Sequence, residues 1–262
     1  MIILHIVNTF FKGGSEKIIH NISINDKNNY HIIICLKNGD FFKFNEKIYY
    51  NVKLIRLNIN KLNFIFKFIK LIQVIKKNKF DIIHTWNYHA DFIGILLSVI
   101  SKKKIIWNIV NYDISIKNKL STYILIRLNG FISRYYKRLT IINCSKNSIK
   151  NHSKIFKNIN VDYIPLGFSK KLFDIDHLVN KKYIKNKIFF GFLARYHKIK
   201  NFELLFEAIS LIKKNNLYIE PHFLIAGSGI TKKHKKINEL IKINKLENYK
   251  NLEIIENVKE VE

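Results

Sequence analysis

The chain has 262 residues, enough for two domains, and 48% of them are hydrophobic, so a packed core is expected. Lys and Arg total 46 against 19 Asp and Glu, a formal net charge of +27, but only five of the basic residues are Arg. Lys, Ile and Asn are all abundant and share AT-rich codons, so we attribute much of the charge to base composition and a solvated lysine surface. No helix-turn-helix, RNA-recognition or zinc-ligand pattern is present to support nucleic-acid binding.

Sequence features also indicate the cellular compartment of the protein. No signal peptide and no apolar stretch of membrane-spanning length is found. Cys35 and Cys144 both lie in apolar runs, where buried and reduced thiols are expected. These features predict a cytoplasmic protein, with a position on the inner face of the cytoplasmic membrane left open.

The first part of the chain alternates short apolar runs with longer amphipathic stretches. The apolar runs are rich in Ile and Val, as are strands buried on both faces of a parallel sheet. They predict strands at residues 2–8, 30–36, 52–59, 80–86, 104–110 and 139–145. Helices are predicted at residues 15–24, 62–77, 90–101, 119–137 and 146–153. This alternation favours a doubly wound α/β sheet.

A second unit follows an interruption. The segment "VDYIPLGFSKKLF", residues 161–173, introduces a proline and a glycine, and a lysine-rich stretch continues to residue 187. The alternation then restarts, with strands predicted at 188–194, 222–226 and 251–255 and helices at 201–214 and 231–245. We therefore predict an α/β protein of two Rossmann-like doubly wound domains, the second incomplete because open α/β domains have about five or six strands. The predicted boundaries are 1–167, a linker at 168–186, and 187–262.

Ligands of such sheets bind beyond the carboxyl ends of the strands. In "FGFLARYHKIKNFELLFEAISLI", residues 190–212, Arg195 follows a predicted strand and Lys200 precedes a predicted helix. An arginine fork, a mobile lysine and helix amides together suit a diphosphate. Two solvated surface cations are the plain alternative. "IAGSG", with Gly227 and Gly229, follows the next strand and offers a second loop at the same edge.

Two further loops follow strands of the first domain. Gly13 and Gly14 precede a predicted helix, where glycine lets a ligand approach the backbone. The alternative is an ordinary turn with Ser15 as the N-cap. His84 is expected at the end of one strand and His89 at the start of the next helix, and each could donate to a substrate hydroxyl or phosphate. A core or capping histidine is the alternative for each of them.

Taken in order, these segments resemble the GT-B glycosyltransferases of the group 1 family, also called family 4. The matching segments are "HIVNTFFKGGSEKIIHNIS", "FDIIHTWNYHADFIGIL", "IIWNIVNYD", "IINCSKNSIKNH", "DYIPLGFSKKLF", "FFGFLARYHKIKNFELLFEAISLI" and "HFLIAGSGITKKHKKINELIKINKLENYKNLEII". The resemblance implies a retaining transferase that needs no cofactor or metal. It implies a nucleotide-sugar donor and a glycan or lipid-linked acceptor, with a role in bacterial surface polysaccharide synthesis such as that of lipopolysaccharide.

The resemblance also assigns roles to residues. Arg195 and Lys200 match the cations that hold the donor diphosphate and stabilise the leaving group. All four glycines are expected to bind the donor: Gly13 and Gly14 match the loop at the sugar-transfer point, and Gly227 and Gly229 match the loop beside the nucleotide base. The acceptor or sugar pocket is expected to include His84, His89, Asn111 and Ser145, where Ser145 matches a strand end.

Departures from the family pattern leave alternatives open. Many relatives have a histidine or arginine where this chain has Val110, and Asn108 or Asn111 could replace that polar contact. The resemblance implies that the family's segment with two glutamates, one of which binds the donor ribose, would fall beyond Glu262. We therefore expect little or no transfer by residues 1–262 alone, and a truncated, inactive GT-B remnant is one alternative. A basic protein that binds nucleic acid or anionic surfaces is an alternative of another class.

Two predicted helical segments combine apolar faces with clustered cations. They are residues 61–80, "KLNFIFKFIKLIQVIKKNKF", and residues 119–139, "KLSTYILIRLNGFISRYYKRL". This pattern suits anionic lipid headgroups and a lipid-linked acceptor, so peripheral membrane contact is predicted. Helices that merely cover a sheet show the same amphipathicity, which is the alternative.

Overall fold

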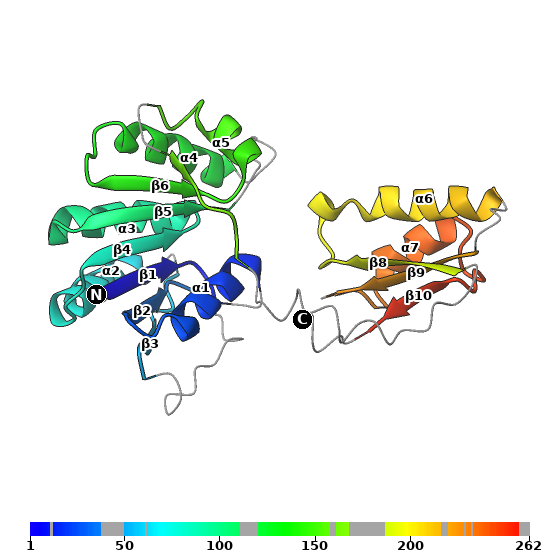
Figure 1. Ribbon diagram of the computed structural model, residues 1–262, viewed down its shortest axis with the longest axis horizontal. Coiled ribbons are helices and arrows are strands. Elements are labelled where there is room, and N and C mark those ends of the chain that lie inside the picture. Colours follow the sequence, from blue (N-terminus) through cyan, green and yellow to red (C-terminus); the bar gives the residue numbers. More distant parts are fainter. Residues whose placement is uncertain are drawn as a thin grey trace. The chain divides into compact units, whose positions relative to one another are not determined.

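The computed structural model (Figure 1) describes residues 1–10, 13–37, 50–60, 62–110, 120–157, 161–167, 187–215, 220–227, 229–231 and 233–256. The chain divides into two compact units, Met1–Gly167 and Phe168–Glu262. The predicted linker, residues 168–186, lies outside the described residues, as does Asn111. The roles predicted for the two domains remain predictions, and each unit is described by itself below.

The first unit is built on a parallel sheet of seven strands. The strands are β1 (Ile2–Val7), β2 (Tyr30–Cys35), β3 (Val52–Arg56), β4 (Ile82–Trp86), β5 (Lys104–Ile109), β6 (Leu139–Asn143) and β7 (Val161–Tyr163), in the spatial order β3-β2-β1-β4-β5-β6-β7. Strand order reverses between β1 and β4, which defines a doubly wound sheet. The six predicted strands are confirmed. The seventh, β7, was missed because its three residues are too few to show a periodicity.

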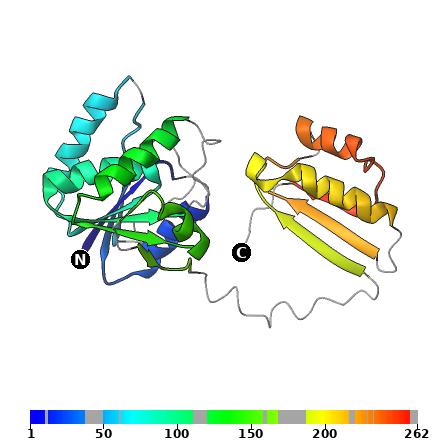
Figure 2. The same ribbon diagram turned by 90° about the horizontal axis from the view of Figure 1, so that it is seen from above.

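Helices cover both faces of this sheet. They are α1 (Gly14–Asn25), α2 (Phe64–Lys77), α3 (Tyr88–Ser101), α4 (Leu120–Ser133) and α5 (Lys146–His152). Helices α2, α3 and α4 lie on one face and α1 on the other (Figure 2). This distribution is what right-handed crossovers require when the strand order turns back on itself.

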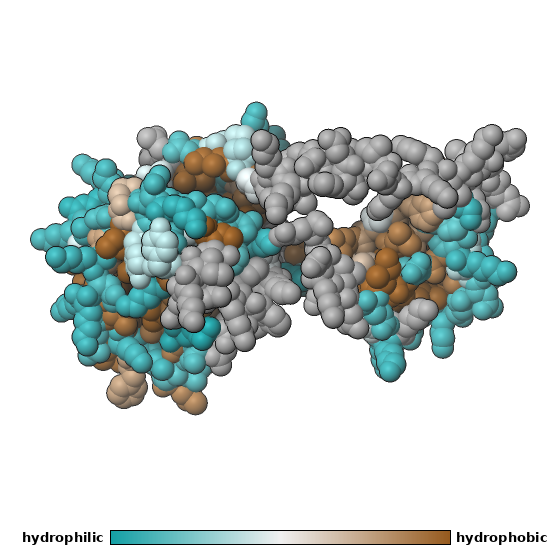
Figure 3. All heavy atoms as spheres, turned by 60° about the horizontal axis from the view of Figure 1, so that its bottom comes forward, coloured by the Kyte–Doolittle hydropathy of each residue, from teal (hydrophilic) through white to brown (hydrophobic). Residues whose placement is uncertain are grey.

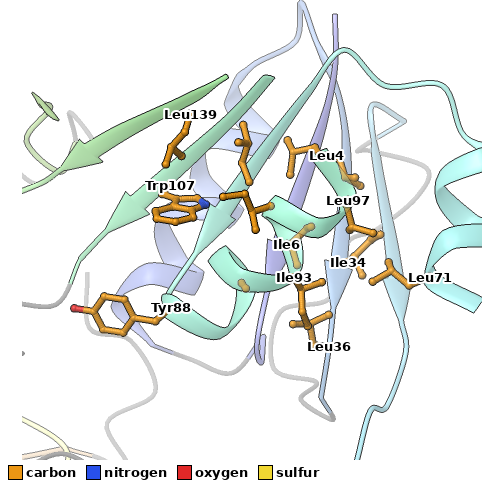
Figure 4. Packing of buried hydrophobic residues seen from close by; sticks show 14 of the residues in the cluster. Leu4, Ile6, Ile34, Leu36, Leu71, Tyr88, Ile93, Leu97, Trp107 and Leu139 are labelled. Atoms are coloured by element: carbon orange, nitrogen blue, oxygen red, sulfur yellow. The ribbon is translucent and has the colours of Figure 1, made fainter. Parts of the chain in front are cut away.

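The main core lies between the sheet and helices α2 to α4. Figure 4 shows Leu71 of α2, Leu97 of α3 and Trp107 of β5 in this layer, and all three are fully buried. A smaller cluster on the α1 face joins Ile19 to Trp86. Burial of an aromatic or branched side chain stabilises the fold by roughly 1.5–3 kcal/mol. The Ile-rich strands therefore supply most of the driving force for this sheet.

The second unit has a three-stranded parallel sheet in the described residues. Its elements are β8 (Lys187–Leu193), a 3-10 turn (Lys198–Lys200), α6 (Phe202–Lys214), β9 (Glu220–Ala226), α7 (Lys235–Ile243) and β10 (Leu252–Ile255), and the strand order is β10-β9-β8. All three predicted strands are confirmed. Helix α7 is shorter than the predicted 231–245 because the His234 side chain caps it by accepting a hydrogen bond from the amide of Ile237.

Both helices of the second unit pack on one face of its sheet. Phe202 and Phe206 of α6 and Ile237 of α7 form a buried cluster with Phe223 and Ile225 of β9. The opposite face carries Phe189 and Leu193 with about half of each side chain exposed, at 51% and 54%. Figure 3 shows apolar residues gathered on the second unit.

No helix in the described part of the chain is both long and apolar enough to cross a membrane.

Candidate functional sites in the two units

Two exposed cations lie where β8 gives way to α6. Arg195 follows the end of β8 by two residues, and Lys200 closes the 3-10 turn that precedes α6. Asn201 then adopts a left-handed conformation, with φ of 50°, and its Oδ1 accepts a hydrogen bond from the amide of Leu204 at 3.4 Å. The strand–helix junction predicted from the sequence is therefore present, with both cations on it.

Neither cation is neutralised by the described part of the chain. Within those ranges, no carboxylate lies within 4.0 Å of Arg195 or Lys200. The first turn of α6 adds backbone N–H groups that are favourable to an anion. The same first turn also carries the exposed carboxylate of Glu203, so this edge of the second sheet presents two cations without an ion-pair partner among the described residues, and one acidic side chain beside them.

The glycine loop after β9 lies directly against the loop after β8. Gly227 has a φ of 144°, and a Cβ atom placed there would collide with the backbone carbonyl of Ala194. Gly229 has a φ of 77°, and its Cβ position would lie 3.8 Å from the Cβ atom of Tyr196. Both glycines are therefore required by backbone geometry, and they lie beside the segment that carries Arg195.

Two ring contacts made by Tyr196 fix this arrangement, and neither was predicted. The ring of Tyr196 lies 4.4 Å from that of His234 and 5.3 Å from that of Phe202, measured between ring centroids. Since Phe202 begins α6 and His234 caps α7, Tyr196 connects the first turns of both helices. The spacing of residues in the sequence could not predict these contacts, because the contacts depend on which loops the fold brings together.

In the first unit, Gly13 and Gly14 lie at the start of α1, beside the point where the strand order reverses. Gly13 is the N-cap, in ordinary extended conformation, with no side-chain cap. The sequence alternative with Ser15 as the N-cap is wrong, because Ser15 lies inside the helix and donates a hydrogen bond to Glu16 Oε2 at 2.8 Å. The Glu16 carboxylate also lies against the Cβ position of Gly13. It therefore occupies the end of the helix that favours anions.

His84 lies inside the sheet and not at a strand end. It is the middle residue of β4, with its ring 5.2 Å from that of His5 and 4.7 Å from that of Trp86. Its Nε2 atom is buried and has no hydrogen-bond partner among the described residues. Burial, followed by the nearby His31, lowers the pKa of His84 to about 4. The ring is therefore a neutral core group, and this placement weighs against the predicted contact with substrate.

His89 does lie at the carboxyl edge of the first sheet. It is an exposed residue in the first turn of α3, and its pKa is lowered by partial burial and then by the charge of Lys37. Lys37 follows β2, so the topology brings it to the same edge as His89. Sequence reasoning did not single out Lys37.

Ser145 caps a helix. It is the N-cap of α5, and its hydroxyl accepts a hydrogen bond from the amide of Ser148 at 3.5 Å. Two buried asparagine oxygens near the same edge have no hydrogen-bond partner in the part of the chain that the structure describes, namely Oδ1 of Asn8, just after β1, and Oδ1 of Asn108 in β5. Within the described ranges, no three His, Cys, Asp or Glu side chains lie close enough to hold a metal ion.

The chain contains two Rossmann-like α/β units, and this defines its fold class. Several solved structures have the same fold. Anabaena HepE in complex with UDP-glucose matches with a TM-score of 0.72 at 17% identity, over 98% of this chain and 69% of HepE. Sucrose-phosphate synthase from Thermosynechococcus elongatus matches with a TM-score of 0.71 at 12% identity, over 98% of this chain and 71% of that protein.

A third structural match is named as an epimerase. UDP-GlcNAc 2-epimerase from Methanocaldococcus jannaschii has a TM-score of 0.55 at 16% identity, over 99% of this chain and 74% of the epimerase. No protein-family model and no curated protein sequence matches the chain. At these identities the matches establish the fold class alone, which is the GT-B fold with two Rossmann-like domains.

Proposed function

We propose that the protein is a glycosyltransferase that moves a hexose or N-acetylhexosamine from a nucleoside-diphosphate donor to a glycan or lipid-linked acceptor. The observation that supports this most directly is the edge of the second sheet. Arg195 and Lys200 lie there without an ion-pair partner among the described residues, beside the first turn of α6 and the backbone loop of Gly227 and Gly229. A nucleoside diphosphate needs cations for its phosphates and exposed backbone beside its base, and this edge offers both.

The cations serve the reaction as well as binding. Cleavage of the bond between sugar and diphosphate places new negative charge on the departing phosphate. Cations held at that position stabilise the transition state more than the bound donor, which accelerates the chemical step. An arginine fork fixes the orientation of a phosphate, and a lysine follows the charge as it develops. Because these side chains supply the positive charge, we propose that transfer needs no metal ion.

The acceptor side is assigned to the carboxyl edge of the first sheet. His89 and Lys37 lie at that edge, and Gly13 and Gly14 begin the helix beside the switch point between β1 and β4. A neutral imidazole can accept or donate a hydrogen bond to a sugar hydroxyl. The sequence resemblance adds the proposals that the anomeric configuration is retained and that the product belongs to a bacterial surface polysaccharide.

The proposal for the donor rests on the ligands named for the structural matches. HepE has been solved with UDP and with UDP-glucose, and the epimerase acts on UDP-GlcNAc. We therefore propose a UDP-sugar as the donor for this chain.

The test is a product analysis with UDP-glucose and UDP-GlcNAc, each with and without a lipid-linked glycan acceptor. A transferase releases UDP and labels the acceptor, and the Arg195→Ala/Lys200→Ala variant should release at least about a hundredfold less UDP, since each charged contact is worth about 1.5–3 kcal/mol. Conversion of UDP-GlcNAc to its 2-epimer without labelled acceptor would replace the transferase proposal. The Lys214→Ala/Lys242→Ala variant serves as the matched control. It also removes two positive charges, but at the C-terminal ends of α6 and α7.

A further inference from the structure

The 3-10 turn that carries Lys200 is held by few contacts. It consists of Lys198–Lys200, and none of these three side chains is buried. The amide of Lys200 donates a hydrogen bond to the carbonyl of His197 at 2.9 Å. The amide of Asn201 donates one to the carbonyl of Lys198 at 3.1 Å. Because hydrogen bonds in short 3-10 turns have poor geometry, the position of Lys200 depends on what else holds this turn.

The side chain of His197 supplies an additional contact. His197 is the N-cap of the turn, and its Nδ1 atom accepts a hydrogen bond from the amide of Ile199 at 3.3 Å. Among the described residues, no other side chain is hydrogen-bonded to the backbone of Lys198–Lys200. An imidazole accepts at Nδ1 when it is neutral and carries its proton on Nε2. The ring of His197 therefore closes the N-terminal side of the turn.

A histidine cap suits a site that binds an anion. The usual N-cap side chains are those of Ser, Thr, Asp and Asn. His197 lies two residues after Arg195 and three before Lys200. An Asp at this position would cap the turn but would also place a carboxylate between the two cations. A neutral imidazole caps the turn without adding negative charge beside a bound diphosphate.

The backbone of Arg195 is held without the help of this cap. On one side of it, the amide of Ala194 donates a hydrogen bond to the carbonyl of Ala226 at 3.0 Å. On the other side, the ring of Tyr196 packs against the first residues of α6 and α7. Strand pairing and ring packing therefore fix Arg195 from both neighbours.

Lys200 lacks this kind of support. Its turn is exposed, and the next residue, Asn201, has a φ of 50°, in the left-handed region that residues other than glycine rarely adopt. A turn that ends in an unfavourable conformation relaxes easily when one of its hydrogen bonds is lost. Removal of the His197 cap should therefore displace Lys200 and leave Arg195 in place.

We propose that His197 is a positioning residue for Lys200, and that its neutral ring holds this lysine where the donor diphosphate binds. The inference rests on the proposed function and adds a residue to which the sequence analysis assigned no role. His197 acts through the backbone of the turn and not by contact with the donor. The effect of removing the imidazole should therefore vanish when the Lys200 side chain is removed as well.

A double-mutant cycle on UDP binding tests this coupling, by calorimetry of the full chain as wild type, His197→Ala, Lys200→Ala and the double variant. Loss of the N-cap should weaken UDP binding about fivefold in His197→Ala. In the Lys200→Ala background the same change should alter the affinity by less than about twofold, because the cap acts through Lys200. His197→Asn provides an amide oxygen as a cap and should bind UDP like wild type. His197→Asp also caps the turn, but its charge should weaken UDP binding.

The matched control is His234→Ala, which removes the same kind of cap from another helix. The Nδ1 atom of His234 accepts a hydrogen bond from the amide of Ile237 at 3.4 Å, but no cation of α7 is assigned to the diphosphate. Its removal should change UDP affinity by the same factor with and without the Lys200 side chain.

Three results would overturn the inference. The first is that His197→Ala weakens UDP binding by the same factor in both backgrounds. The second is that His197→Asn binds UDP as weakly as His197→Ala, and the third is that His234→Ala shows the same dependence on Lys200. Unchanged UDP affinity in Lys200→Ala is a different outcome, because it would refute the proposed diphosphate site and this inference with it.

Discussion

The Nε2 atom of His5 in β1 lies 3.0 Å from the Nδ1 atom of His31 in β2, and the two rings stack inside the first sheet. His84 in β4 lies on the other side of His5, with ring centroids 5.2 Å apart. Burial lowers the pKa of all three histidines. Three neighbouring strands are thus joined by imidazoles that the fold keeps neutral.

This histidine cluster predicts that the first unit loses stability in acid. A histidine whose pKa is lowered by folding takes up a proton in the unfolded chain first, so stability is complete above pH 6.5 and falls as the pH drops toward 4. With a folded pKa of about 4, His84 alone should cost about 2 kcal/mol between pH 8 and pH 5. Urea unfolding at the two pH values measures this loss. His84→Gln should reduce the loss, whereas His197→Gln, at an exposed site in the second unit, should not.

A buried carboxyl group has the opposite dependence on pH. Burial raises the pKa of Asp91 to about 7, although Thr85 Oγ1 donates a hydrogen bond to its Oδ1 at 2.5 Å. Its folded pKa exceeds its unfolded one, so its contribution falls as the pH rises from about 4 to 7. Asp91→Asn keeps the acceptor for Thr85, and its stability relative to wild type should rise by about 2–3 kcal/mol between pH 5 and pH 8. Asp162→Asn, on exposed β7, is the control, and a parallel pH dependence of Asp91→Asn and wild type would contradict this account.

Gly227 and Gly14 should respond differently to alanine. At Gly227 the φ of 144° and the Ala194 carbonyl both exclude a Cβ, so Gly227→Ala should destabilise the second unit by about 2 kcal/mol or more and weaken nucleotide binding. No atom lies within 4 Å of a Cβ at Gly14, and its φ is not positive. Gly14→Ala should therefore leave thermal stability close to wild type. Equal effects of the two variants in differential scanning calorimetry would show that the β8–β9 loop contact is not essential.

Metal removal is expected to leave transfer unchanged. If Arg195 and Lys200 supply the positive charge for the leaving diphosphate, EDTA should not reduce UDP release. Added Mg²⁺ should not rescue the Lys200→Ala variant. A loss of activity in EDTA that Mg²⁺ restores in wild type would show that the ion, and not the side-chain cations, neutralises the diphosphate.

The sequence predicted the α/β alternation well because parallel strands buried on both faces leave continuous Ile and Val runs. The same reasoning placed Arg195 and Lys200 at the strand–helix junction, since both are local features. It failed for His84, because an apolar run does not reveal where its strand ends relative to the sheet edge. Sequence reasoning also missed Asp91 and Tyr196, because the residues that contact them belong to elements distant in sequence.

The central claim is that Arg195 and Lys200 bind a donor diphosphate, and calorimetry with UDP tests it most directly. Each charged contact is worth about 1.5–3 kcal/mol, so Lys200→Ala should weaken binding more than about tenfold and the double Ala variant more than about a hundredfold. The Lys214→Ala/Lys242→Ala control should bind like wild type. UDP binding by a folded Arg195→Ala/Lys200→Ala variant with unchanged affinity would contradict the claim.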